Sequence, residues 1–199
     1  MGGTKNPDVE RIIALGPDLV IANREENRRE DVERLEEAGL RVLVTHPDTV
    51  REAIEMTREL GGILDAADRV AGLIEEVDAA LERPPLSPAP RVLVPIWRRP
   101  FMALGSQSYG HDLLQCAGAL NVFADTPRYP ETTVEEIAAR RPDLILLPDE
   151  PYPFKPEHAA ELSHIAPVIP VDGKLLWWYG PRMPRALREI RRLISQEPA

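Results

Sequence analysis

The chain carries one sequence pattern twice. Val9–Ala22 reads VERIIALGPDLVIA and Val134–Leu147 reads VEEIAARRPDLILL, so the second copy follows the first at a constant offset of 125 residues (134 − 9). Each copy has a short helical pattern followed by an apolar run, which is typical of a helix that leads into a buried strand. A weaker echo follows each copy, LEEAGLRVLVT from Leu35 and LSHIAPVIPVD from Leu162. The repeat therefore predicts two similar structural units.

A long amphipathic segment separates the two copies. Its apolar residues recur at steps of three and four, which is the spacing of one face of an α-helix. We expect a helix over Asp65–Arg83 that starts with Asp65 as its N-cap. Gly61 and Gly62 favour an end to the preceding segment, and the prolines that begin at Pro84 oppose a continuation. One helix is therefore expected to join two similar units.

Helical and strand-like patterns alternate along the rest of the chain. Strands are expected at the apolar runs Leu19–Ala22, Arg41–Thr45, Arg91–Trp97, Phe101–Leu104, Leu144–Leu147 and Val168–Val171. Helices are expected at Asp8–Leu15, Glu30–Ala38, Val50–Leu60 with Thr49 as its cap, His111–Ala117, Val134–Arg140, near Glu157–His164 and after Pro181. Continuous apolar strands are typical of parallel sheets covered on both faces, so the pattern predicts an α/β fold of two Rossmann-like lobes with mostly parallel sheets.

Charge and composition argue against several classes of function. The formal net charge of −9 over 199 residues opposes binding to nucleic acid or anionic lipid. No apolar run approaches the length of a membrane span, and the sequence as written starts with neither the basic nor the apolar region of a signal peptide. The single cysteine, Cys116, excludes an internal disulfide and a thiolate metal cluster.

Aromatic residues gather where the expected strands end. In open α/β sheets, ligands bind outside the carboxyl ends of the strands. All three tryptophans of the chain follow such ends, although aromatic residues make up only 5% of the sequence. The ligand-binding candidates chosen on this ground are Asn23, Trp97, Tyr152, Trp177 and Trp178.

Arginines accompany these rings. Large rings beside Arg98, Arg99 and Arg182 suit a bulky ligand that is partly planar and partly anionic. The alternative is that Trp97 and Trp177 fill the joint between the two lobes and contact no ligand.

The common catalytic motifs are absent from the sequence. It contains no G-x-S-x-G, Walker, G-x-G-x-x-G or H-E-x-x-H pattern. His46 and His111 stand at a strand end and at a helix start, where each either touches a ligand or metal or is an ordinary turn or helix-start residue. His158 and His164 fit the exposed side of a helix. We therefore expect no catalytic residues, no resident metal and no intrinsic cofactor.

Three stretches carry a resemblance to a known family. They are GGTKNPDVERIIALGPDLVIANREENRREDVERLEEAGLRVLVTHPDTV from Gly2, FMALGSQSYGHDLLQCAGALNVFADTPRYPETTVEEIAARRPDLILL from Phe101 and WWYGPRMPRALREI from Trp177. Together with the helix expected over Asp65–Arg83, they resemble the helical-backbone metal-receptor family. These proteins are the substrate-binding components of ABC importers for cobalamin, haem and ferric siderophores.

The resemblance implies a function, a location and further site residues. The chain would bind a metal chelate in a cleft between two lobes, cobalamin or another corrinoid first and a ferric siderophore or haem next. Tyr129 corresponds by position to an aromatic residue that lines the cleft in cobalamin-binding members. Glu30 and Glu157, or Glu161 in place of Glu157, are the nearest matches to acidic residues that meet arginines of the permease; the acidic run around Glu30 is otherwise typical of a solvated helix start. The location implied is periplasmic, or extracytoplasmic at the membrane.

The chain departs from the family at its start. Family members have a signal peptide, a strand, a helix and a second strand before the motif GGTKNP, which here stands at the beginning. We therefore expect a truncated N-terminal lobe over residues 1–64, an interlobe helix with a Pro-rich joint over 65–90, and a C-terminal lobe over 91–199. A shortened sheet leaves unpaired edge groups, so self-association through the truncated lobe is also expected.

Two classes of function stay open. The repeat, the joining helix and the lack of a catalytic set favour a binding protein for a metal chelate. The alternative is a metal-chelating or group-transfer enzyme with two similar α/β lobes. Titration with a coloured chelate separates the two, because a bound corrinoid, haem or ferric siderophore reports by its own absorbance.

Overall fold

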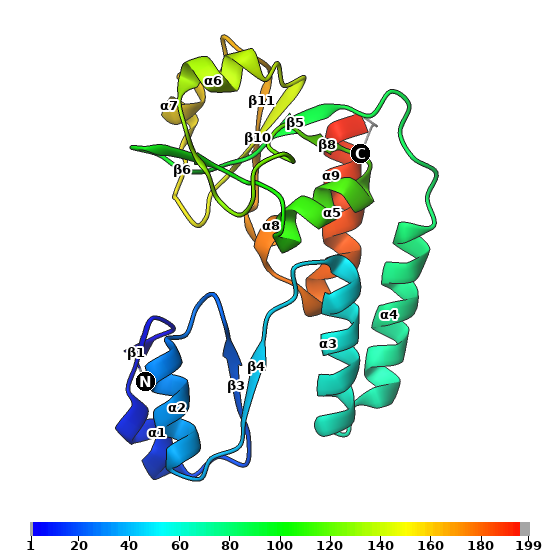
Figure 1. Cartoon of the computed structure of the whole chain (residues 1–199). Helices are drawn as coiled ribbons and strands as arrows, with labels where there is room; N and C mark the ends of the chain where they lie inside the picture. The colour runs from blue at the N-terminus through cyan, green and yellow to red at the C-terminus, as the bar shows by residue number, and fades with distance from the viewer. Residues whose placement is uncertain (1, 196–199) are drawn as a thin grey trace. The chain divides into compact units, whose positions relative to one another are not determined.

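Figure 1 shows the computed structural model of the chain, which describes residues 2–195. The chain divides into two compact units, Met1–His46 (unit 1) and Pro47–Ala199 (unit 2). The sequence pattern grouped the helix Val50–Ile63 with the first lobe. In the structure this helix is part of the compact unit 2. The expected division into lobes at residues 64 and 90 stays a prediction.

Unit 1 is a small α/β unit. In chain order its elements are β1 (Gly2–Gly3), β2 (Asn6–Pro7), α1 (Val9–Leu15), β3 (Val20–Asn23), α2 (Arg29–Glu37) and β4 (Val42–Thr45). The side chain of Asp8 accepts a hydrogen bond from the backbone N–H of Arg11 at 3.2 Å and so begins α1, while Gly16 ends the helix in the left-handed conformation. Strands β3 and β4 pair in parallel with Val20 opposite Val42.

The core of unit 1 is correspondingly small. Among its described residues, the buried apolar side chains are Val9, Ala22 and Leu35. Ile21 in β3 is 50% exposed and Val44 in β4 is 46% exposed. The two-stranded sheet therefore carries apolar side chains that the described chain leaves open to solvent. Self-association through this unit stays a prediction.

Unit 2 contains two sheets and most of the helices. Its helices are α3 (Val50–Ile63), α4 (Ala67–Leu81), α5 (Tyr109–Ala117), α6 (Val134–Ala139), α7 (Pro156–Ala159), α8 (Lys174–Trp177), the 3₁₀ turn η1 (Gly180–Arg182) and α9 (Met183–Ser195). Its strands are β5 (Arg91–Leu93), β6 (Pro95–Trp97), β7 (Phe101–Ala103), β8 (Leu120–Asn121), β9 (Glu131–Thr132), β10 (Leu144–Pro148) and β11 (Val168–Val171). One sheet is parallel, in the order β11-β10-β5-β8, and the other is antiparallel, in the order β6-β7-β9.

The parallel sheet is covered on both faces, as its apolar strands predict. Leu144 and Leu146 of β10 belong to the larger core cluster, to which α3, α4, α5 and α9 contribute. Ile145, between them, belongs to a second cluster with Phe123 and Ile137 on the other face. Successive side chains of a strand point to opposite faces, so a continuous apolar run supplies both clusters.

Helices α3 and α4 form a hairpin, and α4 lies beside both α3 and α9 (Figure 1). The expected cap of α3 is confirmed: Thr49 and Glu52 form a capping box. The expected cap of α4 is wrong, because the N-cap is Ala66 without a side-chain hydrogen bond, and Asp65 instead takes a left-handed turn with φ 52°. Gly61 lies inside α3 and does not end it.

The position of Gly61 has a packing reason. A Cβ atom at this position would lie 2.7 Å from a methyl carbon of Val70 in α4. The missing side chain therefore lets α3 and α4 approach each other closely, and its helix-breaking tendency is overridden by this contact. Gly62 also lies within α3.

The repeat is confirmed as two helix–strand pairs that stand in different sheets. The backbone N–H of Val20 donates to the carbonyl of Arg41 at 2.9 Å, and the N–H of Ile145 donates to the carbonyl of Pro167 at 2.9 Å. In both copies, the weaker echo that follows the pattern forms a parallel neighbouring strand, β4 in the first copy and β11 in the second. A groove shared by the strand ends of the two units stays a prediction.

Several elements differ from the expected ones by more than a few residues at their ends. The segment Arg91–Trp97 is two strands, because the chain passes at Val94 from the parallel sheet into the antiparallel one. The helix expected near Glu157–His164 ends at Ala159, and the segment that leads to Trp177 is the short helix α8. Within residues 2–195, no helix is long and apolar enough to cross a membrane.

Candidate functional site

Two carboxylates stand at the carboxyl ends of neighbouring parallel strands. Asp149 follows β10 and Asp172 follows β11. Asp149 Oδ1 accepts a hydrogen bond from the backbone N–H of Gly173 at 2.8 Å, and Asp172 Oδ1 accepts one from the N–H of Lys174 at 3.0 Å. Because the two donors are adjacent in the chain, they hold the two carboxylates side by side at the strand ends.

Only glycine fits at position 173. A Cβ atom there would lie 2.5 Å from Cγ of Glu150 and 2.8 Å from its carbonyl oxygen. Gly173 therefore lets the segment after β11 approach the segment after β10, and this approach brings its N–H to Asp149.

A pocket of about 290 Å³ opens at these strand ends. Its lining combines apolar side chains with three charged ones and consists of Leu147, Asp149, Phe154, Lys155, Pro156, Pro170, Val171 and Asp172. Leu147, Phe154 and Val171 are buried, so the floor is apolar, whereas Asp149 and Lys155 are exposed. The pocket lies where ligands bind to open α/β sheets.

An aromatic group adjoins this pocket and consists of Trp97, Tyr152, Phe154 and His158. The rings of Trp97 and Tyr152 meet edge to face at 5.3 Å between centroids, and those of Tyr152 and Phe154 lie 4.7 Å apart. The ring of His158 lies 5.8 Å from that of Tyr152. Trp97 remains 43% exposed, so the group presents a ring to solvent, while Phe154 belongs to both the group and the pocket.

Arg98 and Glu161 stand beside the aromatic group as a bidentate ion pair. Arg98 Nε donates to Glu161 Oε2 at 3.0 Å, and a second guanidinium nitrogen donates to Oε1. The hydrogen bond from Arg98 lowers the pKa of Glu161, and the same bond, followed by one involving Tyr152, raises the pKa of Arg98. The charge of Arg98 is therefore matched inside unit 2, and its expected role beside an anionic ligand stays a prediction.

The tryptophans after β11 differ from each other. Trp177 Nε1 donates to the carbonyl of Glu150 at 2.7 Å. Its ring packs against Gly110, where an added Cβ atom would lie 2.9 Å from Cζ3 of Trp177. Trp178 is 50% exposed, with the guanidinium of Arg182 at 5.2 Å from its ring centroid. Trp177 thus holds the segment after β10 in place, whereas Trp178 presents its ring to solvent.

The remaining predicted site residues are Tyr129, Asn23, Glu30 and Glu157. Tyr129 is half-buried against the larger core cluster, with the guanidinium of Arg128 at 5.4 Å from its ring. Asn23 ends β3 in unit 1, where its side-chain oxygen accepts from the N–H of Glu25 at 2.9 Å. Glu30 and Glu157 are exposed in the first turns of α2 and α7.

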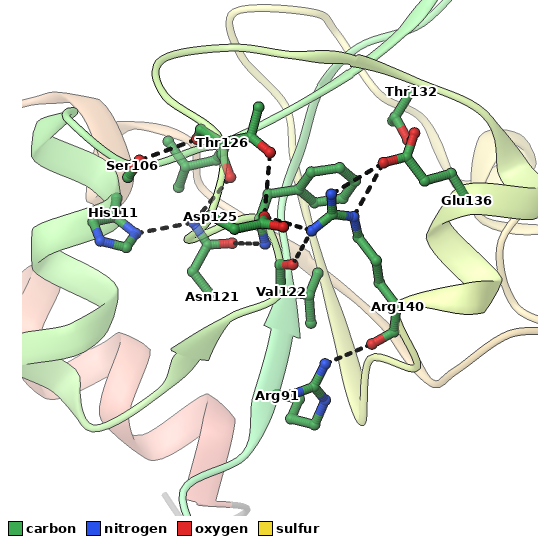
Figure 2. A network of polar contacts seen from close by, with 12 residues as sticks. Arg91, Ser106, His111, Asn121, Val122, Asp125, Thr126, Thr132, Glu136 and Arg140 are labelled. Atoms are coloured by element: carbon green, nitrogen blue, oxygen red, sulfur yellow. Dashed lines mark hydrogen bonds and ion pairs between the residues drawn. The ribbon is translucent and has the colours of Figure 1, made fainter.

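A separate network of polar groups surrounds Arg140, and its members form hydrogen bonds with one another (Figure 2). The Arg140 guanidinium donates to Asp125 at 2.6 Å and to the carbonyl of Val122 at 2.7 Å, and it lies 3.9 Å from the Phe123 ring centroid. Glu136, on α6, accepts two further bonds. These groups satisfy one another, which is typical of a structural network that ties α6 to the segment after β8.

His111 belongs to the same region (Figure 2). Its Nδ1 lies 3.1 Å from the side-chain nitrogen of Asn121, which also donates to the carbonyl of Leu104 at 2.9 Å. An amide nitrogen is a donor, so Nδ1 accepts and the imidazole proton is placed on Nε2. Burial lowers the pKa of His111, which favours the neutral ring. Ligand contact by His111 stays a prediction.

Four residues of the pocket are not among the candidates chosen from the sequence: Asp149, Phe154, Lys155 and Asp172. The rule that ligands lie at strand ends identifies Asp149 and Asp172 by position, because each is the first residue after its strand. Phe154 and Lys155 had no comparable signal, since the loop between β10 and α7 brings them to the pocket. In the part of the chain that the structure describes, no three histidine, cysteine, aspartate or glutamate side chains are grouped so as to hold a metal ion.

Comparison with known proteins gives consistent matches along the chain. A family model described as "Periplasmic binding protein" matches residues 1–166. A vitamin B12-binding protein of Salmonella typhi is 28% identical over 203 residues, which cover 95% of this chain and 73% of the relative.

Solved structures match at lower identity. A periplasmic heme-binding protein, BhuT, solved in complex with two hemes, has a TM-score of 0.80 at 23% identity. The match covers 97% of this chain and 80% of the BhuT chain. The periplasmic vitamin B12-binding protein BtuF of Vibrio cholerae has a TM-score of 0.73 at 18% identity, with 98% and 81% covered. At these identities the structures show the fold, and the fold is that of two-lobed periplasmic binding proteins.

Proposed function

The chain belongs to the periplasmic binding protein family, and from this premise we propose that it is the substrate-binding protein of an ABC importer for a metal chelate. The ligand proposed first is cobalamin or another corrinoid, and haem or a ferric siderophore comes next. The names of the relatives support this order, because the matching sequences include vitamin B12-binding proteins and the matching structures include heme-binding and B12-binding proteins.

The observation that carries the proposal is the aromatic group at the strand ends of unit 2. Exposed Trp97 and half-buried Tyr152 form an edge-to-face pair beside a pocket with an apolar floor. A corrin or porphyrin is a broad, largely planar ring with an apolar surface, and each aromatic contact adds about 0.5–1.5 kcal/mol beyond the area it buries. Trp178 is a second exposed ring after β11 that suits the same ligand.

The proposal extends to partners and location. Glu30 and Glu157 are exposed acidic residues in first turns of helices, where a permease with basic residues could reach them. Glu161 suits this role less well, since Arg98 already holds its carboxylate. A periplasmic or extracytoplasmic location agrees with the family.

Absorbance titration tests the ligand directly. Cyanocobalamin, hemin and a ferric hydroxamate siderophore are each added to the full chain, and both the ligand spectrum and tryptophan fluorescence are followed. We expect saturable binding of a corrinoid with quenching of tryptophan fluorescence. If none of the three chelates binds, the proposal is wrong.

A variant pair locates the binding surface. Trp97→Ala is expected to weaken binding by about 1 kcal/mol or more, which is the scale of a binding hot spot. Leu120→Ala is the matched control, because Leu120 is 49% exposed and begins β8 at the opposite, amino end of the parallel sheet. Equal affinities of both variants would assign Trp97 to a role other than ligand contact.

A further inference from the structure

We propose that the pocket lined by Asp149 and Asp172 is a subsite for an amide side group of the ligand, and that these two carboxylates select amide-bearing corrinoids over chelates that carry carboxylates. The inference rests on the proposed function. It goes further by assigning a subsite, two residues and a chemical preference to unit 2.

The pocket is placed to receive a peripheral group of a planar ligand. Phe154 lines the pocket and lies 4.7 Å from the ring of Tyr152, which in turn meets Trp97 at 5.3 Å. The aromatic group and the pocket therefore share Phe154. A macrocycle that packs against Trp97 and Tyr152 has its rim beside Phe154, where a side group can enter the volume of about 290 Å³.

The floor and the polar groups of the pocket fit a short amide chain. Leu147 and Val171 are buried and supply contacts for methylene groups. Asp149 and Asp172 each use Oδ1 to accept a backbone N–H, and within residues 2–195 the other oxygen of each carboxylate has no hydrogen-bond partner. A carboxylate oxygen only accepts hydrogen bonds, so it pairs with the NH₂ of a primary amide.

The same groups oppose a carboxylate ligand. The charged residues of the lining are two aspartates and one lysine, so a carboxylate would add a third negative charge against a single ammonium group. Arg98 offers no compensation, because its guanidinium is already paired with Glu161. Like charges placed together at a binding site repel each other, whereas a neutral amide meets no such penalty. The peripheral groups of cobinamide are amides, whereas haem carries two propionates.

The deciding experiment compares two corrinoids with the same ring and metal. Dicyanocobinamide carries amides at its periphery, and dicyanocobyrinic acid carries carboxylates. The full chain is titrated with each by absorbance, and we expect cobinamide to bind at least about tenfold more tightly. The ratio is measured at low and high salt, because the net charge of −9 also repels carboxylates at long range and salt screens that repulsion.

Two variants assign the preference to the pocket. The double variant Asp149→Asn and Asp172→Asn keeps an oxygen for each backbone N–H and removes both charges, so it is expected to bind cobyrinic acid more tightly and to bring the ratio close to one. Asp68→Asn, in the exposed first turn of α4, is the control for one unit of net charge and is expected to leave the ratio unchanged.

The outcomes separate this inference from the proposed function. Equal affinities for the two corrinoids, or an unchanged ratio in the double variant, would overturn the subsite and leave corrinoid binding intact. Binding of hemin without either corrinoid would overturn both the subsite and the corrinoid assignment. If no chelate binds at all, the proposed function itself fails.

Discussion

The two copies of the repeated pattern form the same local structure in unequal surroundings. Among the described residues of unit 1, β3 has a single partner strand, and Ile21 is 50% exposed. In unit 2, β10 lies between two strands of a four-stranded sheet, and Leu146, which occupies the equivalent position 125 residues later (146 − 21), is fully buried. The same helix–strand pattern thus forms a partly exposed strand in unit 1 and a strand that is buried on both faces in unit 2.

The comparison extends to the ends of the first helix in each copy. Asp8 and Thr133 are equivalent N-caps, and each accepts a backbone N–H at 3.2 Å, from Arg11 and Glu136 respectively. Local interactions are therefore preserved while burial is not. This teaches that the pattern specifies helix and strand, whereas the number of neighbours decides how much stability the strand gains from packing.

The largest expected difference concerns the equivalent residues of β3 and β10. Leu146→Ala is expected to lower the free energy of unfolding by about 2–5 kcal/mol, because it leaves a cavity in a packed core. Ile21→Ala is expected to cost less than about 1 kcal/mol, since half of the side chain is already in contact with water. Urea unfolding followed by far-ultraviolet circular dichroism measures both. Equal costs would mean that Ile21 is covered in solution, for example by a second copy of the chain.

Hydrogen exchange tests the comparison without mutation. The amides of Val20 and Ile145 make the same 2.9 Å hydrogen bond to the neighbouring strand, so a difference in protection reports the stability of the surroundings. We expect the Val20 amide to be at least about tenfold less protected, equivalent to about 1.4 kcal/mol, because the thinly packed unit opens more easily. Equal protection of both amides would contradict this.

The equivalent caps are expected to show smaller and matched effects. Thr133→Ala and Asp8→Ala should each cost about 1 kcal/mol of helix stability. The loss at Thr133 is visible in unfolding followed by tryptophan fluorescence, since all three tryptophans lie in unit 2. The loss at Asp8 appears only as faster exchange of amides in unit 1. Ser163→Ala, an exposed hydroxyl with a long 3.5 Å hydrogen bond, is the neutral control.

The smallest effect is expected just after these helices. Gly16 and Arg141 are equivalent, and both take the left-handed conformation, with φ 56° and φ 48°. A residue with a side chain is strained there, so Arg141→Gly is expected to stabilise unit 2 by about 0.5–1 kcal/mol. The reverse change, Gly16→Arg, is expected to destabilise unit 1 and to speed amide exchange there. A lower unfolding midpoint for Arg141→Gly would show that its side chain contributes more than the strain costs.

The α/β class and most elements followed from the sequence, because the signals that fix them are local. Apolar periodicity located α3, α4 and β11, and the Thr49 cap needs only the neighbouring Glu52. The failures were also local signals, overridden by packing. Gly61 stays inside α3 because its missing side chain admits Val70 of α4.

Strand order and the site depended on contacts between distant parts of the chain. At Val94 the chain passes from one sheet to another, and no local pattern marks this exchange of partners. Trp97 and Tyr152 were each identified as candidates from strand ends, but their edge-to-face contact is decided by tertiary structure.

The sequence by itself determined the repeated helix–strand units and the concentration of aromatic residues at strand ends. These depend on backbone preferences and spacings within a few residues. Only the tertiary structure decided that Arg98 is neutralised by Glu161, that Asp149 and Asp172 share one pocket, and that one copy of the repeat is buried while the other stays open. The physical reason is that burial and charge pairing depend on which distant segments come together, and a local pattern carries no information about its neighbours in space.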